Sequence, residues 1–206
     1  MITKWLGLSL VLMLVGMTTL VHGTPPMETL QKPMNEIVSI LKDPQYREKD
    51  KKEVQREELW KIIRGIFDFR EMSKRSLARN WKRFNSGQRD RFTDVFSTLL
   101  GNIYLNKVQG EYHDERVVYL GEAIIKDKKA IVKTEIVREN GKIPMNYHLR
   151  LHGKKWKIYD VIIEGVGLVK NYRTQFKKIL RKVSPDQLIE RLKKKNEAQK
   201  KKTAQQ

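Results

Sequence analysis

The feature that most constrains the fold is a change in the spacing of apolar residues near Gly110. Before Gly110, apolar residues recur every three to four positions, most regularly between Phe92 and Tyr104. After Gly110, apolar and polar residues alternate in short runs. A spacing near 3.6 is typical of an amphipathic helix, and a spacing of 2 of a half-buried strand. The chain is therefore predicted to form helices followed by a sheet, which is an α+β domain.

Four strands are predicted beyond Gly110, over residues 116–125, 130–138, 143–152 and 155–166. The turn sequences between them are short, so consecutive strands should be antiparallel neighbours. In the third strand apolar and polar residues alternate from Met145 to His152, which predicts one apolar and one wet face. In the last strand the apolar phase shifts near Tyr159, which predicts a bulge that curls the sheet.

Helices are predicted on both sides of these strands in the sequence. Those before the sheet include a capping box at Asp68 and Glu71 and a long helix from Ser86. Two more follow Gly167, the second opening at Ser184. The predicted fold is a curled four-stranded antiparallel sheet with helices packed on it, a nuclear-transport-factor-like cone that encloses an apolar cavity.

The N-terminus has the layout of a cleavable secretory signal. Lys4 precedes an uncharged, mostly apolar run from Trp5 to Val21, and Val21 and Gly23 suit the positions before a cleavage site. The run is shorter than the roughly 20 apolar residues that a spanning helix needs. We therefore predict a signal peptide at residues 1–23, a single domain at 24–195 and a basic disordered tail at 196–206.

The charge and the missing cysteines narrow the class of function. The chain has a formal net charge of +19 and no cysteine. Without cysteine, a lipoprotein anchor, a disulfide framework and a thiolate metal site are excluded. For an exported protein, the polyanions that a basic surface meets are phospholipid head groups, lipopolysaccharide and acidic proteins, and not nucleic acid. The helix after Gly167 carries the residues predicted to bind a partner: Lys170, Arg173, Lys177 and Arg181.

Residues able to do chemistry are few. Asp160 and Glu164 are the candidates for a general base, although Asp160 is better explained as a cap of the bulge or a partner of Arg173. His148 and His152 are four positions apart in a strand, about 13 Å, and cannot bind one metal ion together. No phosphate-binding loop or nucleophile motif is found. We predict a protein that is not an enzyme and holds no metal or cofactor.

Two segments resemble a known family. YDVIIEGVGLVKNYRTQFKKIL at 159–180 and FDFREMSKRSLARNW at 67–81 closely resemble the MlaC family, also called the toluene-tolerance auxiliary family. GQRDRF from Gly87, WKIYDV from Trp156, LIERL from Leu188 and the order of elements also fit, whereas Gly167 stands where the family usually has serine. The resemblance implies a monomeric periplasmic shuttle that carries phospholipid. It would pass this cargo between an outer-membrane lipoprotein complex and an inner-membrane ABC transporter complex with an MCE domain.

If the cone holds acyl chains, its wall is formed by the inward residues of the later strands and of the helices that face them. The predicted lipid-binding residues are Leu100, Tyr104, Tyr147, Leu149, Val161, Ile163, Val166, Leu168, Tyr172 and Phe176. The tyrosines suit the mouth, because a phenol tolerates one wet end. The competing hypothesis is an extracytoplasmic adaptor with a solid core, whose basic helix binds an acidic protein or lipopolysaccharide and which carries no lipid.

Overall fold

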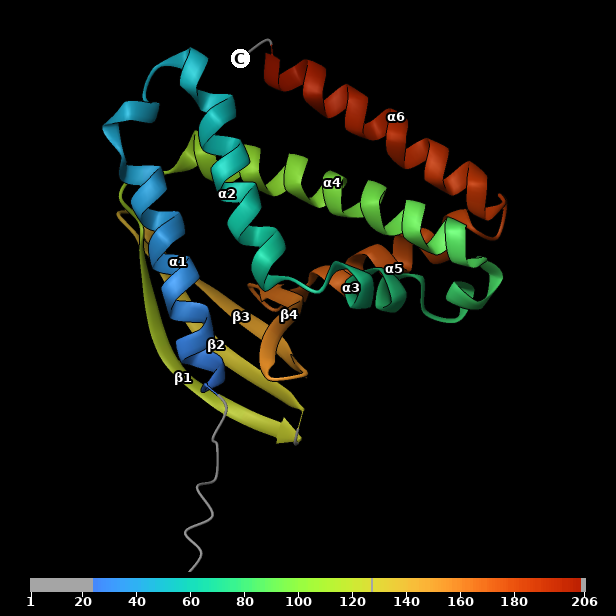
Figure 1. Ribbon diagram of the computed structural model, residues 1–206, viewed down its shortest axis with the longest axis horizontal. Coiled ribbons are helices and arrows are strands. Elements are labelled where there is room, and N and C mark those ends of the chain that lie inside the picture. Colours follow the sequence, from blue (N-terminus) through green and yellow to red (C-terminus); the bar gives the residue numbers. More distant parts are fainter. Residues whose placement is uncertain (1–23, 127, 205–206) are drawn as a thin grey trace, which may run out of the picture.

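The computed structural model describes residues 24–126 and 128–204 (Figure 1). The predicted signal peptide therefore lies outside the described residues. The elements before the sheet are α1 (Pro26–Lys42), η1 (Pro44–Tyr46), η2 (Lys49–Lys51), α2 (Lys52–Ile66), α3 (Phe69–Leu77), η3 (Ala78–Arg83) and α4 (Ser86–Glu111). The sheet and its following helices are β1 (Arg116–Lys126), β2 (Lys129–Arg138), β3 (Gly141–His152), β4 (Lys155–Ile163), β5 (Val166–Gly167), α5 (Leu168–Ile179) and α6 (Pro185–Ala204). In the described part of the chain, no helix combines the length and apolarity that a membrane crossing requires.

The sheet confirms the predicted antiparallel meander and adds one strand to it. Its order is β1-β2-β3-β4-β5, and every neighbouring pair is antiparallel. The added strand, β5, has two residues and is too short to show an alternation. The predicted bulge is present, since Leu149 pairs with Ile158 and His148 with Asp160, which leaves Tyr159 unpaired. Further register shifts lie in β1, and the strand is visibly curved in Figure 1.

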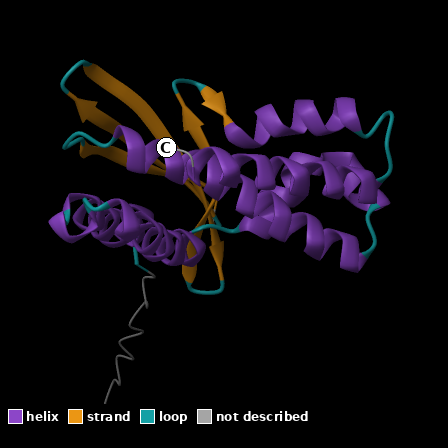
Figure 2. Cartoon of the chain, turned by 90° about the horizontal axis from the view of Figure 1, so that it is seen from above, coloured by secondary structure: helices purple, strands orange, loops and turns teal. Residues whose placement is uncertain are grey.

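One face of the sheet, here called the inner face, is covered by α1. Leu30 of α1 is buried with Val132 of β2, Leu149 of β3 and Ile158 of β4. Leu149 and Ile158 are cross-strand partners, and Val132 is two residues from Ala130, the β2 partner of Leu149. All of them therefore point to the same face of the sheet. The other helices gather beside the sheet, so that the helical part and the sheet lie next to each other (Figure 2). Their arrangement separates two apolar interiors.

The second interior lies among α3, α4, α5 and α6 and is built on aromatic rings. Phe92 of α4 has no exposed surface, and its ring centroid lies 5.4 Å from that of Phe176 and 5.6 Å from that of Phe84. Phe96 stacks one turn further along α4, 5.5 Å from Phe92. Edge-to-face and offset contacts of this kind favour a rigid, dry packing.

The C-terminal segment differs from the prediction of a disordered tail at 196–206. Helix α6 continues to Ala204 and runs along α4 (Figure 1). Asn196 is buried there, where it donates a hydrogen bond to the Val95 carbonyl at 3.0 Å and accepts one from Asn102 at 3.3 Å. These contacts fix α6 to α4 at Asn196, and the helix continues beyond it through mostly exposed residues.

Candidate functional site

The predicted lipid-binding residues are distributed over the two apolar interiors. We call the first the sheet cluster, consisting of Leu30, Ala130, Val132, Tyr147, Leu149, Trp156, Ile158 and Val161. The second is the helix cluster, with Met72, Leu77, Phe84, Phe92, Phe96, Leu99, Leu100, Val169, Tyr172, Phe176, Leu180, Leu188, Ile189 and Leu192. Ile163 and Leu168 pack against the sheet cluster and Tyr104 against the helix cluster. Val166 is 61% exposed and reaches neither.

Phe67 joins the two clusters. It is the residue after α2, it is partly buried, and it packs against both the sheet cluster and the helix cluster. Its backbone forms a bridge with Ile158, and the next amide, that of Asp68, donates to the Ile158 carbonyl at 2.8 Å. Its ring stacks on Phe69 at 5.5 Å. Phe67 therefore stands at the boundary between the two interiors, fixed to β4 by its backbone.

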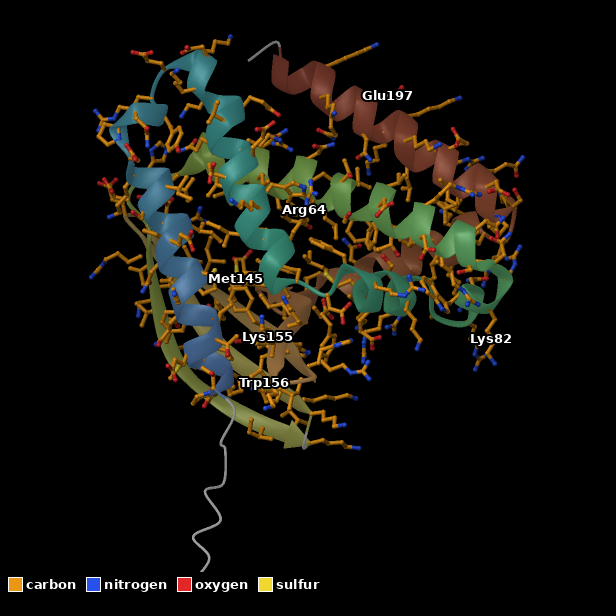
Figure 3. All side chains as sticks on the ribbon, viewed as in Figure 1. Arg64, Lys82, Met145, Lys155, Trp156 and Glu197 are labelled. Atoms are coloured by element: carbon orange, nitrogen blue, oxygen red, sulfur yellow. The ribbon has the colours of Figure 1, made fainter. Side chains whose placement is uncertain are left out.

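A groove with a volume of about 560 Å³ opens at Phe67. Its residues are Trp60, Arg64, Phe67, Asp68, Phe69, Thr93, Asp94, Ser97, Thr98, His152 and Lys157. Trp60 packs so closely on α4 at Gly101 that a Cβ atom there would lie 2.9 Å from its ring. Arg64, labelled in Figure 3, lies over the Trp60 ring with its Cζ 5.1 Å from the centroid. The groove thus has an aromatic floor and a charged rim.

Two phenols on the inner face of the sheet have poor hydrogen-bond partners. The Tyr147 hydroxyl donates to the Met145 sulfur at 2.9 Å, a weak acceptor. The Tyr119 hydroxyl is buried and has no hydrogen-bond partner among the described residues. Burial raises the pKa of Tyr119 to about 12 and also raises the pKa of Tyr147. Buried polar groups normally have a partner, so the Tyr119 hydroxyl is an exception on the inner face of the sheet.

We expect alkali to destabilise the protein in part through Tyr119. Its raised pKa means that the folded state favours the neutral phenol. The contribution of Tyr119 to the free energy of unfolding is therefore fully present below pH 10.0 and is lost as the pH rises through about 12. Tyr119→Phe should make the loss between these values smaller. At neutral pH it should raise the free energy of unfolding by about 1 kcal/mol, because an unpartnered hydroxyl is removed. Denaturant titrations across this pH range test both effects, with Tyr46→Phe as the control outside the two clusters; equal alkaline losses in both variants would contradict the assignment.

A second pair of phenols lies at the helix cluster. Tyr172 of α5 packs edge-on against Phe96, with centroids 4.9 Å apart. Burial and, as the smaller cause, the neighbouring Tyr104 together raise the pKa of Tyr172 to about 12. The predicted mouth tyrosines are therefore split, with Tyr104 and Tyr172 on the helix cluster and Tyr147 on the sheet cluster.

Asp160 has a structural task in the described chain. Its Oδ1 accepts hydrogen bonds from the Val161 amide at 2.9 Å, at the bulge, and from the Val169 amide at 3.0 Å, in the first turn of α5. Gly167, the N-cap residue, has no side chain to do this, and a Cβ there would lie 2.9 Å from the Ile162 side chain. Burial raises the pKa of Asp160, against the two backbone hydrogen bonds that lower it. The predicted cap of the bulge is thus confirmed, and it also caps α5.

Asp160→Ala should lower the free energy of unfolding by about 1 to 2 kcal/mol, the usual loss when a helix cap is removed. Asp160→Asn keeps an acceptor oxygen and should cost less. Because the folded pKa is raised, the wild type should gain stability relative to the Asn variant as the pH falls toward 3.8, and lose that gain as the pH rises through the folded pKa. Thermal denaturation of the wild type and both variants at several pH values measures these differences. Equal losses of stability in Asp160→Ala and Asp160→Asn would argue against capping.

The residues predicted to bind a partner lie on the exposed side of α5 and, for Arg181, just beyond its C-terminal end. Lys170, Arg173, Lys177 and Arg181 are all exposed, and Arg173 donates to the Arg75 carbonyl at 2.9 Å. This contact ties α5 to α3, while the positive charge of Arg173 still lowers the pKa of Asp160. Over residues 24–126 and 128–204, no group of three or more histidine, aspartate or glutamate side chains is placed to hold a metal ion.

Sequence reasoning missed Phe67, Trp60 and Tyr119 as site residues. For Tyr119 a signal was available, since it lies in the same alternation phase as Val117, on the side of β1 that pairs with buried Thr134. Phe67 follows the apolar residues Ile62, Ile63 and Ile66 at helical spacing, and nothing in the local sequence shows that it ends the helix and touches the sheet. The position of Trp60 depends on its contact with Gly101, which is distant in the sequence.

Comparisons with known proteins agree on one family. The sequence model described as MlaC protein matches residues 31–194. Toluene tolerance protein ttg2D of Pseudomonas putida is 26% identical over 172 residues, which are 82% of this chain and 79% of that protein. The solved structure of a phospholipid-binding protein from Ralstonia solanacearum, in complex with a phospholipid, superposes with a TM-score of 0.74 at 21% identity, over 83% of this chain and 96% of that one. Because the family match spans most of the sequence, this chain belongs to the MlaC family.

Proposed function

We propose that this protein is a periplasmic phospholipid carrier that moves lipid between the two membranes without covalent chemistry. The observation that carries the proposal is the junction at Phe67, where two apolar clusters meet beside an open groove. The related protein from Ralstonia solanacearum, which has the same fold, was solved with a phospholipid bound. The acyl chains would enter beside Phe67 and lie along the sheet cluster, with the head group at the charged rim of the groove.

The cations at the groove rim suit the phosphate of such a lipid. Arg64 and Lys157 both line the groove and carry positive charge, as a phosphate requires. The Lys157 ammonium donates a hydrogen bond to the Gly65 carbonyl, which holds it at the rim.

An apolar interior is sufficient for the proposed task. Moving hydrocarbon out of water is worth about 0.8 kcal/mol per methylene, so two chains with about thirty buried methylenes correspond to roughly 20 kcal/mol. Free diffusion of lipid through water is therefore negligible. A carrier whose interior resembles a bilayer makes transfer nearly balanced in free energy, and shape matters more than any single polar contact. The outer-membrane lipoprotein complex and the MCE-domain transporter are the partners that the proposal requires.

The test is solvent extraction of the purified protein followed by lipid mass spectrometry, combined with native mass spectrometry of the intact complex. Bound phospholipid in a defined ratio to protein is expected. Incubation with labelled donor vesicles should load the lipid-free protein, and acceptor vesicles should unload it. A protein that stays lipid-free in both experiments would support the adaptor instead, in which the exposed basic side of α5 binds an acidic partner.

A further inference from the structure

The end of the sheet at the β1–β2 turn exposes large apolar side chains. Ile124 is 56% exposed and Ile125 is 54% exposed, and both lie at the end of β1, just before the turn to β2. Strand β1 is the edge of the sheet, so no further described strand covers it. Ile124 stands opposite Ala130, whose side chain is buried in the sheet cluster. The exposed isoleucines thus lie at the projecting end of the strand pair that forms one wall of that cluster.

Basic side chains surround these isoleucines. Lys126, Lys128 and Lys129 belong to the same turn and are described as exposed or half-exposed, while Asp127 between them lies outside the described residues. The β3–β4 turn, with exposed Lys154 and Lys155, lies at the same end of the sheet. The Leu151 amide donates to the Lys128 carbonyl at 3.0 Å, and Lys129 pairs with Arg150. We call Ile124, Ile125, Lys126, Lys128, Lys129, Lys154 and Lys155 the hairpin patch.

A second groove, with a volume of about 530 Å³, adjoins the hairpin patch. Its residues are Asp68, Arg70, Glu71, Lys74, Trp81, Lys128, Arg150, Leu151, His152 and Gly153. Asp68 and Glu71 are outnumbered by the four lysines and arginines that line this groove. Glu71 also forms salt bridges with Arg75 at 2.8 Å and with Arg150 at 3.2 Å. Lys74 and Lys128 thus approach the groove from opposite sides, from α3 and from the turn. The patch continues into a basic hollow large enough for a head group.

We propose that the hairpin patch docks this protein onto the surface of a bilayer that contains anionic phospholipids. A membrane surface has an outer layer of anionic head groups and an inner layer of hydrocarbon. The lysines of the hairpin patch match the first layer, and the two isoleucines match the second. An acidic protein would satisfy the lysines, but it would also need a pocket to receive two isoleucines from a protruding tip. The patch consists of exposed residues and half-exposed Lys129, all outside both apolar clusters, so docking does not depend on bound cargo.

The experiment measures sedimentation of the full chain with vesicles of phosphatidylethanolamine and phosphatidylglycerol, and with vesicles of phosphatidylcholine alone. Binding to the anionic vesicles is expected, with little binding to phosphatidylcholine and a decrease at high salt. Ile124→Ser/Ile125→Ser should weaken binding about tenfold, because partial burial of two isoleucines is lost. Lys126→Ser/Lys128→Ser/Lys129→Ser should weaken it roughly a hundredfold, since each lysine near an anionic surface contributes a factor of about five.

Matched controls change the same residue types elsewhere. Val54→Ser/Val108→Ser removes two other exposed apolar side chains, and Lys193→Ser/Lys194→Ser/Lys195→Ser removes three exposed lysines from α6. Both should bind the vesicles within about twofold of the wild type. The proposal is overturned if the α6 variant loses as much binding as the hairpin variant, because the attraction is then diffuse charge. It is also overturned if soluble polyglutamate competes fully for the protein while the isoleucine variant binds normally, because the partner is then an acidic protein. Lipid content is measured in every sample, so failure of docking is distinguished from failure to carry cargo.

Discussion

Ile163→Asp is expected to lower the phospholipid bound per protein at least tenfold. Ile163 packs against the sheet cluster but is only partly buried. Its cross-strand partner in β3 is Met145, whose sulfur accepts the hydrogen bond from the Tyr147 hydroxyl. A carboxylate there would be desolvated when an acyl chain entered, and an unpaired charge in hydrocarbon costs several kcal/mol. Because Ile163 is only partly buried, the fold should tolerate the change better than it would at fully buried Leu149. Extraction and quantification of lipid, normalised to folded protein, gives the result.

The matched control is Val118→Asp, which introduces the same charge at a 38% exposed position of β1 on the other face of the sheet. This variant should carry as much lipid as the wild type. Reversal of charge at Lys177 of α5 and at Arg181, which follows α5, should also leave the cargo unchanged while weakening binding to an acidic partner, more strongly at low salt. If Ile163→Asp keeps its lipid and its melting temperature, the sheet cluster is not where the acyl chains lie.

The sequence was most informative wherever a structure depends on neighbours along the chain. Helix α4 follows from its apolar spacing, and its Asn85 and Gln88 capping box starts one residue before the predicted cap at Ser86. The bulge at Tyr159 follows from a phase shift, and the Ser184 and Gln187 capping box of α6 is present as predicted. Each of these features is decided within about ten residues, which is the range over which periodicity and capping act.

The parts that could not be predicted depend on contacts between distant segments. Alternation placed Val166 inward, but β5 is so short that exposure is decided by where the sheet ends. Phe67 looked like one more apolar position of a helix, and only the path of β4 shows that it touches both clusters. The segment from Asn196 was predicted from its composition to be a disordered tail, whereas α6 continues to Ala204 and the Asn196 side chain is buried against α4. The division of the predicted cavity wall into the sheet cluster and the helix cluster also depends on contacts between distant segments.

Phe92→Ala should produce the largest loss of stability, about 3 to 5 kcal/mol in the free energy of unfolding. Phe92 has no exposed surface and contacts the rings of Phe84, Phe96 and Phe176, so removing it opens a cavity bounded by rigid aromatic side chains from η3 to α5. Such a cavity collapses poorly, because each neighbouring ring is held by further contacts. For a chain of this length a loss of 1 kcal/mol lowers the melting temperature by about 2 to 4 °C, so a decrease of roughly 10 °C is expected.

Phe92→Leu is the control, because it preserves most of the volume and should cost about 1 kcal/mol. The comparison also tests the separation of the two clusters. Phe92 belongs to the helix cluster and touches no residue of the sheet cluster among its ring contacts, so the folded fraction of Phe92→Ala should still bind phospholipid at the sheet cluster. If the variant instead gains bound lipid, or loses less than about 1 kcal/mol, the space left by the ring is one that acyl chains already enter. The helix cluster would then be part of the cargo site, and the boundary at Phe67 would separate two compartments of one cavity.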